Sequence, residues 1–330
     1  MKLPLFIEPY ANLAKGHNPK QQILLIFKQL GLPIIGLLVF LMLWSGAAKN
    51  IETSLGNFPG PIEVYQQFNN LLDEHQAEKE RAQAFYERQE ARIAARLEVD
   101  PDFVPTIRPY TGAPTFIDQI KTSLFTVFTA FVIGSLIAIP IGILIGMSDG
   151  LYRAVNPVIQ LFKPVSPLAW LPLVTLVVSA LYVSESPMFQ TAFIVSAITV
   201  LLSSIWSTII NTAVGVATAS KDLLNVSKVL NLNPWTHVTK ILIPSAIPMI
   251  FTGLRISLGI AWMVLIAAEM LSQSPGLGKF IWDQFQNGSS ESMSRIMVAV
   301  LVIGFIGFLL DRLMLVLQKF VSWDKSAVLR

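Results

Sequence analysis

Residues 122–148 read TSLFTVFTAFVIGSLIAIPIGILIGMS and contain no charged side chain. Crossing about 30 Å of hydrocarbon takes roughly 20 helical residues, so this stretch is long enough to span a membrane once. Only helices and closed barrels satisfy their backbone groups in lipid, and the continuous apolar pattern lacks the alternation of a barrel strand. The stretch therefore predicts an all-α membrane protein.

Five further apolar runs have the composition of membrane spans. They lie at 31–45, 166–183, 188–210, 247–269 and 296–318. We therefore predict a polytopic protein with about six transmembrane helices. Only a short polar break at 184–187 separates two of these runs, which predicts a hairpin.

The overall composition agrees with a membrane protein. The chain has 330 residues, of which 53% are hydrophobic and only 14% are charged, whereas soluble domains average about a quarter charged residues. The absence of cysteine excludes disulfides, thiolate metal sites and cysteine nucleophiles. The net charge of +3 comes from basic residues that flank the apolar runs, so membrane topology explains it better than nucleic-acid binding.

The lysines and arginines of the short loops predict that both termini are cytoplasmic. The expected organisation has five parts. They are a cytoplasmic segment 1–30, a first transmembrane helix 31–45, a periplasmic insert 46–119, a core domain 120–318 with five transmembrane helices and a loop at 211–246, and a cytoplasmic tail 319–330.

The external insert contains a dense mixture of both charge signs at 71–97, where a narrow apolar stripe at helical spacing is interrupted by Gln89. We predict an exposed helix, followed by a proline-rich extended linker. Two interpretations remain open. The helix is either a solvated decoration packed on the rim of the bundle, or a docking element for an external partner.

The loop at 211–246 is long for a connection in a compact bundle and is expected to fold. Helices are predicted at 222–230 and 235–243. They are separated by Asn231, which tolerates the left-handed conformation that ends a helix, and by Pro234, which suits the first turn of the next helix.

This loop also resembles a known motif. The segments SKVLN (227–231), KILIP (240–244) and IPMIFTGLR (247–255) resemble the EAA loop of binding-protein-dependent ABC importer permeases. The family's opening glutamate falls on Asn225, its two alanines on Val226 and Ser227, its glycine on Asn231 and its final proline on Pro244. The spacing is kept, but Asn225 cannot supply the glutamate's carboxylate.

Other segments look like the nitrate, sulfonate and taurine branch of these permeases: NPVIQL (156–161), PVSPLAWLP (164–172), GIAW (259–262) and AAE (267–269). INTAVGV (210–216) and LNVSKVL (224–230) are closer to the nitrate and bicarbonate members. The resemblance implies a type I (MetI-like) fold and a homodimeric pore in lipid of a bacterial inner membrane. It also implies cytoplasmic ATP-binding subunits and an external binding protein, with no cofactor. The expected substrate is nitrate or nitrite, with sulfonate, taurine or bicarbonate as alternatives.

The resemblance implies that the loop docks into a groove on the ATPase, and spaced apolar side chains suit that role. The alternative is that the loop only caps its own bundle. The expected coupling residues are Asn225, Ser227, Val229, Leu230, Asn231, Leu232, Trp235 and Pro244.

Polar residues within the spans are candidates for the translocation path: Ser196, Thr199, Ser203, Arg255 and Glu269. Hydroxyls equally mediate close helix packing in lipid. Arg255 either attracts an anion or binds lipid phosphate or the loop, and Glu269 makes a structural bond or a gate contact. Asp311 and Arg312 are expected to pair with each other.

Catalytic signatures are absent from the sequence. It has no glycine-rich phosphate loop with its lysine, so ATP hydrolysis would belong to another chain. His17, His75 and His237 are predicted on both sides of the membrane, which argues against a shared metal site. An ion-coupled secondary transporter is expected to contain paired intramembrane acidic residues or inverted repeats. A membrane enzyme is expected to contain clustered histidines or carboxylates. Neither pattern is visible in the sequence.

Overall fold

The computed structural model describes residues 18–53, 56–100, 102–183 and 189–321. Parts of the predicted N-terminal segment (1–17), hairpin break (184–187) and tail (322–330) lie outside these residues. The helical elements are α2 (Pro19–Ile26), the π-helical turn η1 (Phe27–Gly31), α3 (Leu32–Ala48), α4 (Pro61–Val99), α5 (Phe116–Gly146), α6 (Asp149–Phe162), α7 (Pro167–Leu181), α8 (Thr191–Ala217), α9 (Lys221–Val229), α10 (Pro234–His237), the π-helical turn η2 (Val238–Leu242), α11 (Ile243–Ser272), α12 (Leu277–Asn287) and α13 (Ser290–Val321). A small antiparallel hairpin of β1 (Glu52–Thr53) and β2 (Gly56–Asn57) was not predicted.

The prediction of a helical membrane protein is confirmed, because five described segments are long and apolar enough to cross a membrane. They are Gln21–Ala48, Phe116–Gly146, Thr191–Ala217, Pro234–Ser272 and Glu291–Val321. The predicted span at 166–183 differs, since α7 has only 15 residues and meets α6 at a 96° bend. Pro164 and Pro167 flank this bend, and Ser166 caps α7 by accepting a hydrogen bond from the Leu168 amide. Counting α6 and α7 as one broken span gives six crossings.

The predicted short helix at 235–243 is not separate from the span that follows it. α10, η2 and α11 form one continuous run from Pro234 to Ser272. Pro244 removes an amide donor, and the turn before it widens to the π-helical η2 instead of ending the helix. At the other side of the loop, α8 continues to Ala217, so the beginning of the predicted loop belongs to that helix.

α8 forms the centre of the bundle, with its most extensive contacts to α11 and α5. The approach to α5 depends on glycine. A Cβ on Gly142 would lie 2.6 Å from the Cβ of Thr212, and one on Gly146 would lie 2.5 Å from the Ala213 carbonyl oxygen. Small residues allow such close backbone contact in membranes. These glycines therefore fix the α5–α8 interface.

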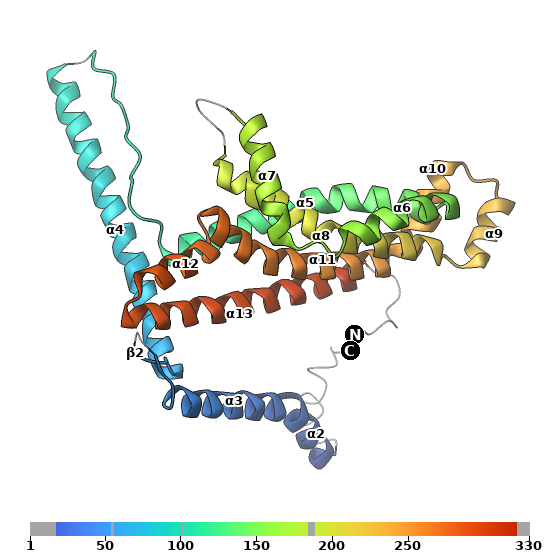
Figure 1. Cartoon of the computed structure of the whole chain (residues 1–330), viewed down its shortest axis with the longest axis horizontal. Helices are drawn as coiled ribbons and strands as arrows, with labels where there is room; N and C mark the ends of the chain where they lie inside the picture. Colours follow the sequence, from blue (N-terminus) through green and yellow to red (C-terminus); the bar gives the residue numbers. More distant parts are fainter. Residues whose placement is uncertain (1–17, 54–55, 101, 184–188, 322–330) are drawn as a thin grey trace.

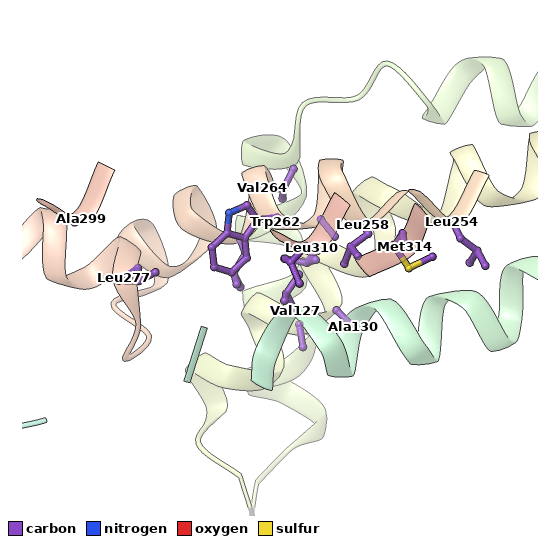
Figure 2. Close-up of a cluster of buried hydrophobic side chains, with 14 of the residues drawn as sticks. Val127, Ala130, Leu254, Leu258, Trp262, Val264, Leu277, Ala299, Leu310 and Met314 are labelled. Atoms are coloured by element: carbon purple, nitrogen blue, oxygen red, sulfur yellow. The ribbon is translucent and has the colours of Figure 1, made fainter. Parts of the chain in front are cut away.

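The largest buried apolar cluster joins α5, α11, α12 and α13 (Figure 2). Leu258 and Trp262 of α11 lie at its centre, next to Val127 of α5 and Leu310 of α13. Trp262 also donates its indole N–H to the Ile303 carbonyl at 3.0 Å. The cluster holds the outer helices against the central pair α8 and α11.

The N-terminal helix α3 lies apart from this bundle, whereas α4 packs against α13 at one end of it (Figure 1). The most apolar window of Gln21–Ala48 has no buried residue, so α3 leaves its apolar surface uncovered by the rest of this chain. The predicted exposed helix is confirmed as α4, which begins ten residues before the predicted start at residue 71 and has 39 residues. α4 and α12 lie at one end of the long axis, and α9 and α10 lie at the other.

Candidate functional site

The α9–α10 loop is a closed helix-turn-helix. Asn231 has φ 50°, the left-handed conformation expected for the residue after a helix end. The amides of Asn231 and Leu232 donate to the carbonyls of Lys228 and Ser227, both at 3.1 Å, which is the double bond pattern of a Schellman motif. Asn233 then caps α10 by accepting a 2.7 Å hydrogen bond from the Thr236 amide. The turn chemistry predicted for this loop is therefore present.

A side-chain contact joins the two helices of the loop. The Ser227 hydroxyl lies 2.6 Å from His237 Nδ1, and Ser227 is buried. Ser227 thus faces its own chain, although it was predicted among the ATPase-coupling residues. No partner was predicted for His237, because the ten-residue separation from Ser227 carries no helical spacing that would have revealed this pair.

Large apolar side chains point out of the loop. Val229 is 85% exposed and Trp235 is 76% exposed, and Leu230 is also exposed. Leu232 is half-buried, while Asn225 and Pro244 are exposed. Monomeric proteins in water rarely leave such a group uncovered. The loop therefore presents an apolar surface suited to a partner.

An apolar groove of about 610 Å³ continues this surface along the end of α5. Trp235 and Val238 form one wall, and Ile143 and Leu144 of α5 form the other together with Met147, which follows α5. The groove therefore lies between the loop and the end of α5.

The predicted hydroxyls of α8 lie in the interior of the chain. Ser196 is buried and its hydroxyl lies 2.9 Å from that of Ser272. Ser203 donates to the Thr199 carbonyl at 2.8 Å, and the buried Thr199 hydroxyl has no hydrogen-bond partner among the described residues. These positions match the packing interpretation within a single chain. Their role in a translocation path stays a prediction.

Arg255 forms an ion pair with Asp311 across α11 and α13. Its Nε donates to Oδ1 and its Nη2 donates to Oδ2 at 2.9 Å. The predicted pair of Asp311 with Arg312 is wrong, because neighbouring residues on a helix do not face each other. Arg312 instead lies over the Phe308 ring, 5.0 Å from its centroid. Asp311 thus balances the charge that Arg255 would offer to an anion.

Glu269 is fully buried at the opposite end of α11. Ser123 of α5 donates to its two carboxylate oxygens at 2.8 and 2.9 Å, and the Gly278 amide donates at 3.0 Å. The Leu277 amide donates in turn to Ser123 at 2.9 Å. This network joins α5, α11 and the start of α12, where a carboxylate is favoured by the helix dipole. The sequence did not reveal Ser123 as a partner.

The histidines of the described part of the chain are not gathered in a shared site. No group of three histidine, aspartate or glutamate side chains there could hold a metal ion. His75 and His237 lie on elements at opposite ends of the molecule.

Comparisons with known proteins agree with this geometry. Residues 138–323 match the family model described as "Binding-protein-dependent transport system inner membrane component". The chain is 38% identical to the nitrate import permease protein NrtB of Synechococcus elongatus over 204 residues, which are 62% of this chain and 69% of that protein. It is 40% identical to the bicarbonate transport system permease protein CmpB of Synechocystis over 205 residues, 62% of this chain and 68% of that protein.

A solved structure shares the fold. A chain of the MetNI methionine ABC transporter in an inward-facing conformation aligns with a TM-score of 0.54 and 14% sequence identity. The alignment covers 63% of this chain and 96% of the transporter chain. At this identity the likeness concerns the fold alone.

Proposed function

The chain belongs to the family of inner membrane components of binding-protein-dependent transport systems, and we propose that it forms the pore of an ATP-driven importer for a small anion. The observation that carries the proposal is the capped α9–α10 loop with its exposed apolar side chains, which lies inside the matched residues 138–323. The chain itself is a multi-pass, non-enzymatic membrane subunit.

In this proposal the loop couples the pore to ATP hydrolysis in a separate cytoplasmic subunit. Val229, Leu230 and Trp235 insert into a groove on that subunit, as amphipathic helices do in other grooves. The fixed turn at Asn231 holds the side chains in place, so closure of the ATPase pulls on α10 and its continuation α11. Asn225 supplies no carboxylate, so the binding of the loop to the ATP-binding subunit depends on apolar contact.

Nitrate or nitrite is the proposed substrate, delivered by an external binding protein. The relatives named for nitrate import support this choice, at 38% and 40% identity in two cyanobacteria. Bicarbonate is the second candidate, because the bicarbonate permease of Synechocystis is 40% identical as well. Taurine or another sulfonate is a third candidate within the same branch. Within the described spans Arg255 already pairs with Asp311, so anion selection belongs chiefly to the binding protein.

The proposed assembly is a homodimer in the lipid of the bacterial inner membrane, with both termini in the cytoplasm. The uncovered apolar surface of α3 supports burial by lipid or by the second copy. An ion-coupled secondary transporter is the competing class. It lacks support because the membrane carboxylates Glu269 and Asp311 are both occupied by partners of this chain.

Reconstituted vesicles test the proposal. The permease, its ATP-binding subunits and its binding protein are combined, and uptake of nitrate, bicarbonate and taurine is compared. We expect uptake of nitrate that requires both ATP and the binding protein. Uptake driven by an ion gradient without ATP would contradict the importer, and bicarbonate uptake without nitrate uptake would contradict the substrate.

A further inference from the structure

α4 and the chain that follows it form a rigid external arm, defined as residues 72–99 of α4 with the return segment 102–114. The base of the arm is fixed to the bundle. Val64 and Leu71 are buried in the main apolar cluster, and Glu74 forms an ion pair with Arg295 of α13. His75 Nδ1 lies 2.6 Å from the hydroxyl of Thr115, which caps α5. The arm is therefore anchored to two spanning helices.

The return segment forms hydrogen bonds to α4 between the base and the tip, and we call this part of α4 the shaft. Tyr110 donates its hydroxyl to Glu78 at 2.7 Å, and its amide donates to the Tyr86 hydroxyl at 3.1 Å. The hydrogen bond to Glu78 raises the pKa of Tyr110 above its ordinary value. Gln89, which interrupts the apolar stripe, accepts from the Arg108 amide at 3.3 Å and donates to its carbonyl at 3.5 Å. The arm therefore consists of two segments that contact each other, α4 and the return segment, and is not a single solvated helix.

The far end of the arm carries an apolar surface, which we call the arm tip. Val99 and Val104 are 85% and 82% exposed, and Leu97 is also exposed. Figure 1 shows that α4 runs across the long axis of the bundle and that its end lies farther out along this axis than the outer ends of α12 and α13. Exposed apolar side chains at the end of an arm that is fixed to the bundle indicate an interaction site.

We propose that the arm tip docks the soluble substrate-binding protein on the outer face of the permease. The inference rests on the proposed function, since it needs an importer with such a partner. The arm lies at the opposite end of the molecule from the α9–α10 loop, which places it on the side where substrate arrives. It also lies outside the matched residues 138–323, so it adds to the common permease core.

The size of the arm tip favours this partner over a second copy of the chain. Three side chains are far fewer than the 20 to 30 residues per side of a stable interface. A binding protein must bind and leave in every transport cycle, which suits a small, weak contact. The shaft between base and tip exposes mainly charged and polar side chains, including Glu87, Arg88 and Glu90. The arm tip therefore adds a small contact to a larger docking surface on the outer face of the permease.

The test uses the full complex in vesicles and the purified binding protein of the same system as the probe. Val99→Glu combined with Val104→Glu places two charges on the arm tip. We expect the binding-protein concentration for half-maximal ATPase stimulation to rise about tenfold, while the maximal rate changes less than twofold. Val99→Ala with Val104→Ala removes the same contacts without adding charge, and should produce a smaller rise in the same direction.

The matched control is Ala84→Glu with Ala91→Glu, which adds the same charge at exposed positions of the shaft. We expect it to behave like the unaltered chain. Equal responses of tip and shaft variants, or unaltered responses of both tip variants, would overturn the docking role of the tip. Dissociation of the permease dimer by the tip variants would overturn the choice of partner. If the unaltered complex shows no stimulation by binding protein, the proposed function fails instead.

Discussion

The α9–α10 loop and the external arm lie at opposite ends of the molecule and are held in place by different kinds of contact. Bonds between neighbouring residues close the loop, at Asn231, Asn233 and the Ser227–His237 pair. The arm depends on side chains far apart in the sequence, such as Glu74 and Arg295. Single substitutions should therefore disturb the loop, whereas the arm should lose its position only when several contacts are removed.

The largest effect is expected from removal of the apolar anchors of the loop. Leu230→Ala with Trp235→Ala should weaken ATPase binding roughly a thousandfold, since central anchors each contribute about 2 kcal/mol or more. Co-purification and ATP-dependent uptake measure the loss. The matched control is Phe305→Ala with Leu309→Ala, which truncates exposed apolar side chains of α13. Equal losses in both variants would show that the loop has no special role.

A smaller effect is expected at the turn. Asn231→Val places a β-branched residue at φ 50°, which costs about 1–2 kcal/mol, whereas Asn231→Gly fits the same conformation. We expect the valine variant to lower ATPase affinity about tenfold and the glycine variant to retain it. Titration of the reconstituted complex with ATPase measures both. A fully active valine variant would contradict a turn fixed by local chemistry.

The Ser227–His237 contact should contribute about 1 kcal/mol to the folding of the loop. Ser227→Ala or His237→Ala should therefore increase hydrogen exchange in α9 about fivefold, with no change in α4. A double-mutant cycle isolates the pair. Strict additivity of the two substitutions would mean that the contact stabilises nothing.

In the arm, Glu74→Ala should have a smaller effect, below about 1 kcal/mol, because the Glu74 side chain is half exposed and solvent screens the pair. The buried residues Val64 and Leu71 still hold the base. Hydrogen exchange beyond Leu71 should change less than fivefold. Release of the whole arm by this one substitution would reverse the comparison between arm and loop.

Asn225→Lys is expected to have the smallest effect. The residue is exposed and holds the family's glutamate position without a carboxylate, so a positive charge should change uptake less than about twofold. Uptake is measured in parallel for Asn225→Lys and for the variant that combines Leu230→Ala with Trp235→Ala. A loss as large as theirs would mean that polar contact at Asn225 contributes to the grip.

Local sequence patterns predicted much of the fold. Long uncharged runs gave the spans, and Asn231 before Pro234 gave the turn, because turn chemistry acts between neighbouring residues. Proline was the misleading signal. The helix predicted at 235–243 ended just before Pro244, but η2 carries the helix through this residue. At Pro164 and Pro167 the chain bends sharply, and the predicted single span becomes α7 joined to α6.

Pairings over long separations could not be predicted. Ser123 and Glu269 are 146 positions apart, and Arg255 and Asp311 are 56 apart, so no periodicity connects them. Gln89 looked like a break in an apolar stripe because its partner, the backbone of Arg108, belongs to a segment without regular structure. The roles of Ser196, Thr199 and Ser203 in a translocation path stay predictions.

Site-specific cross-linking tests the contact between loop and ATPase most directly. The chain contains no cysteine, so Val229→Cys and Val99→Cys each introduce a single thiol, one in the loop and one at the arm tip. Each variant is labelled with a thiol-to-amine cross-linker before assembly with the ATP-binding subunits. We predict a cross-link to the ATPase from position 229 and none from position 99. Absence of the link at 229, or an equal link at 99, would contradict the account.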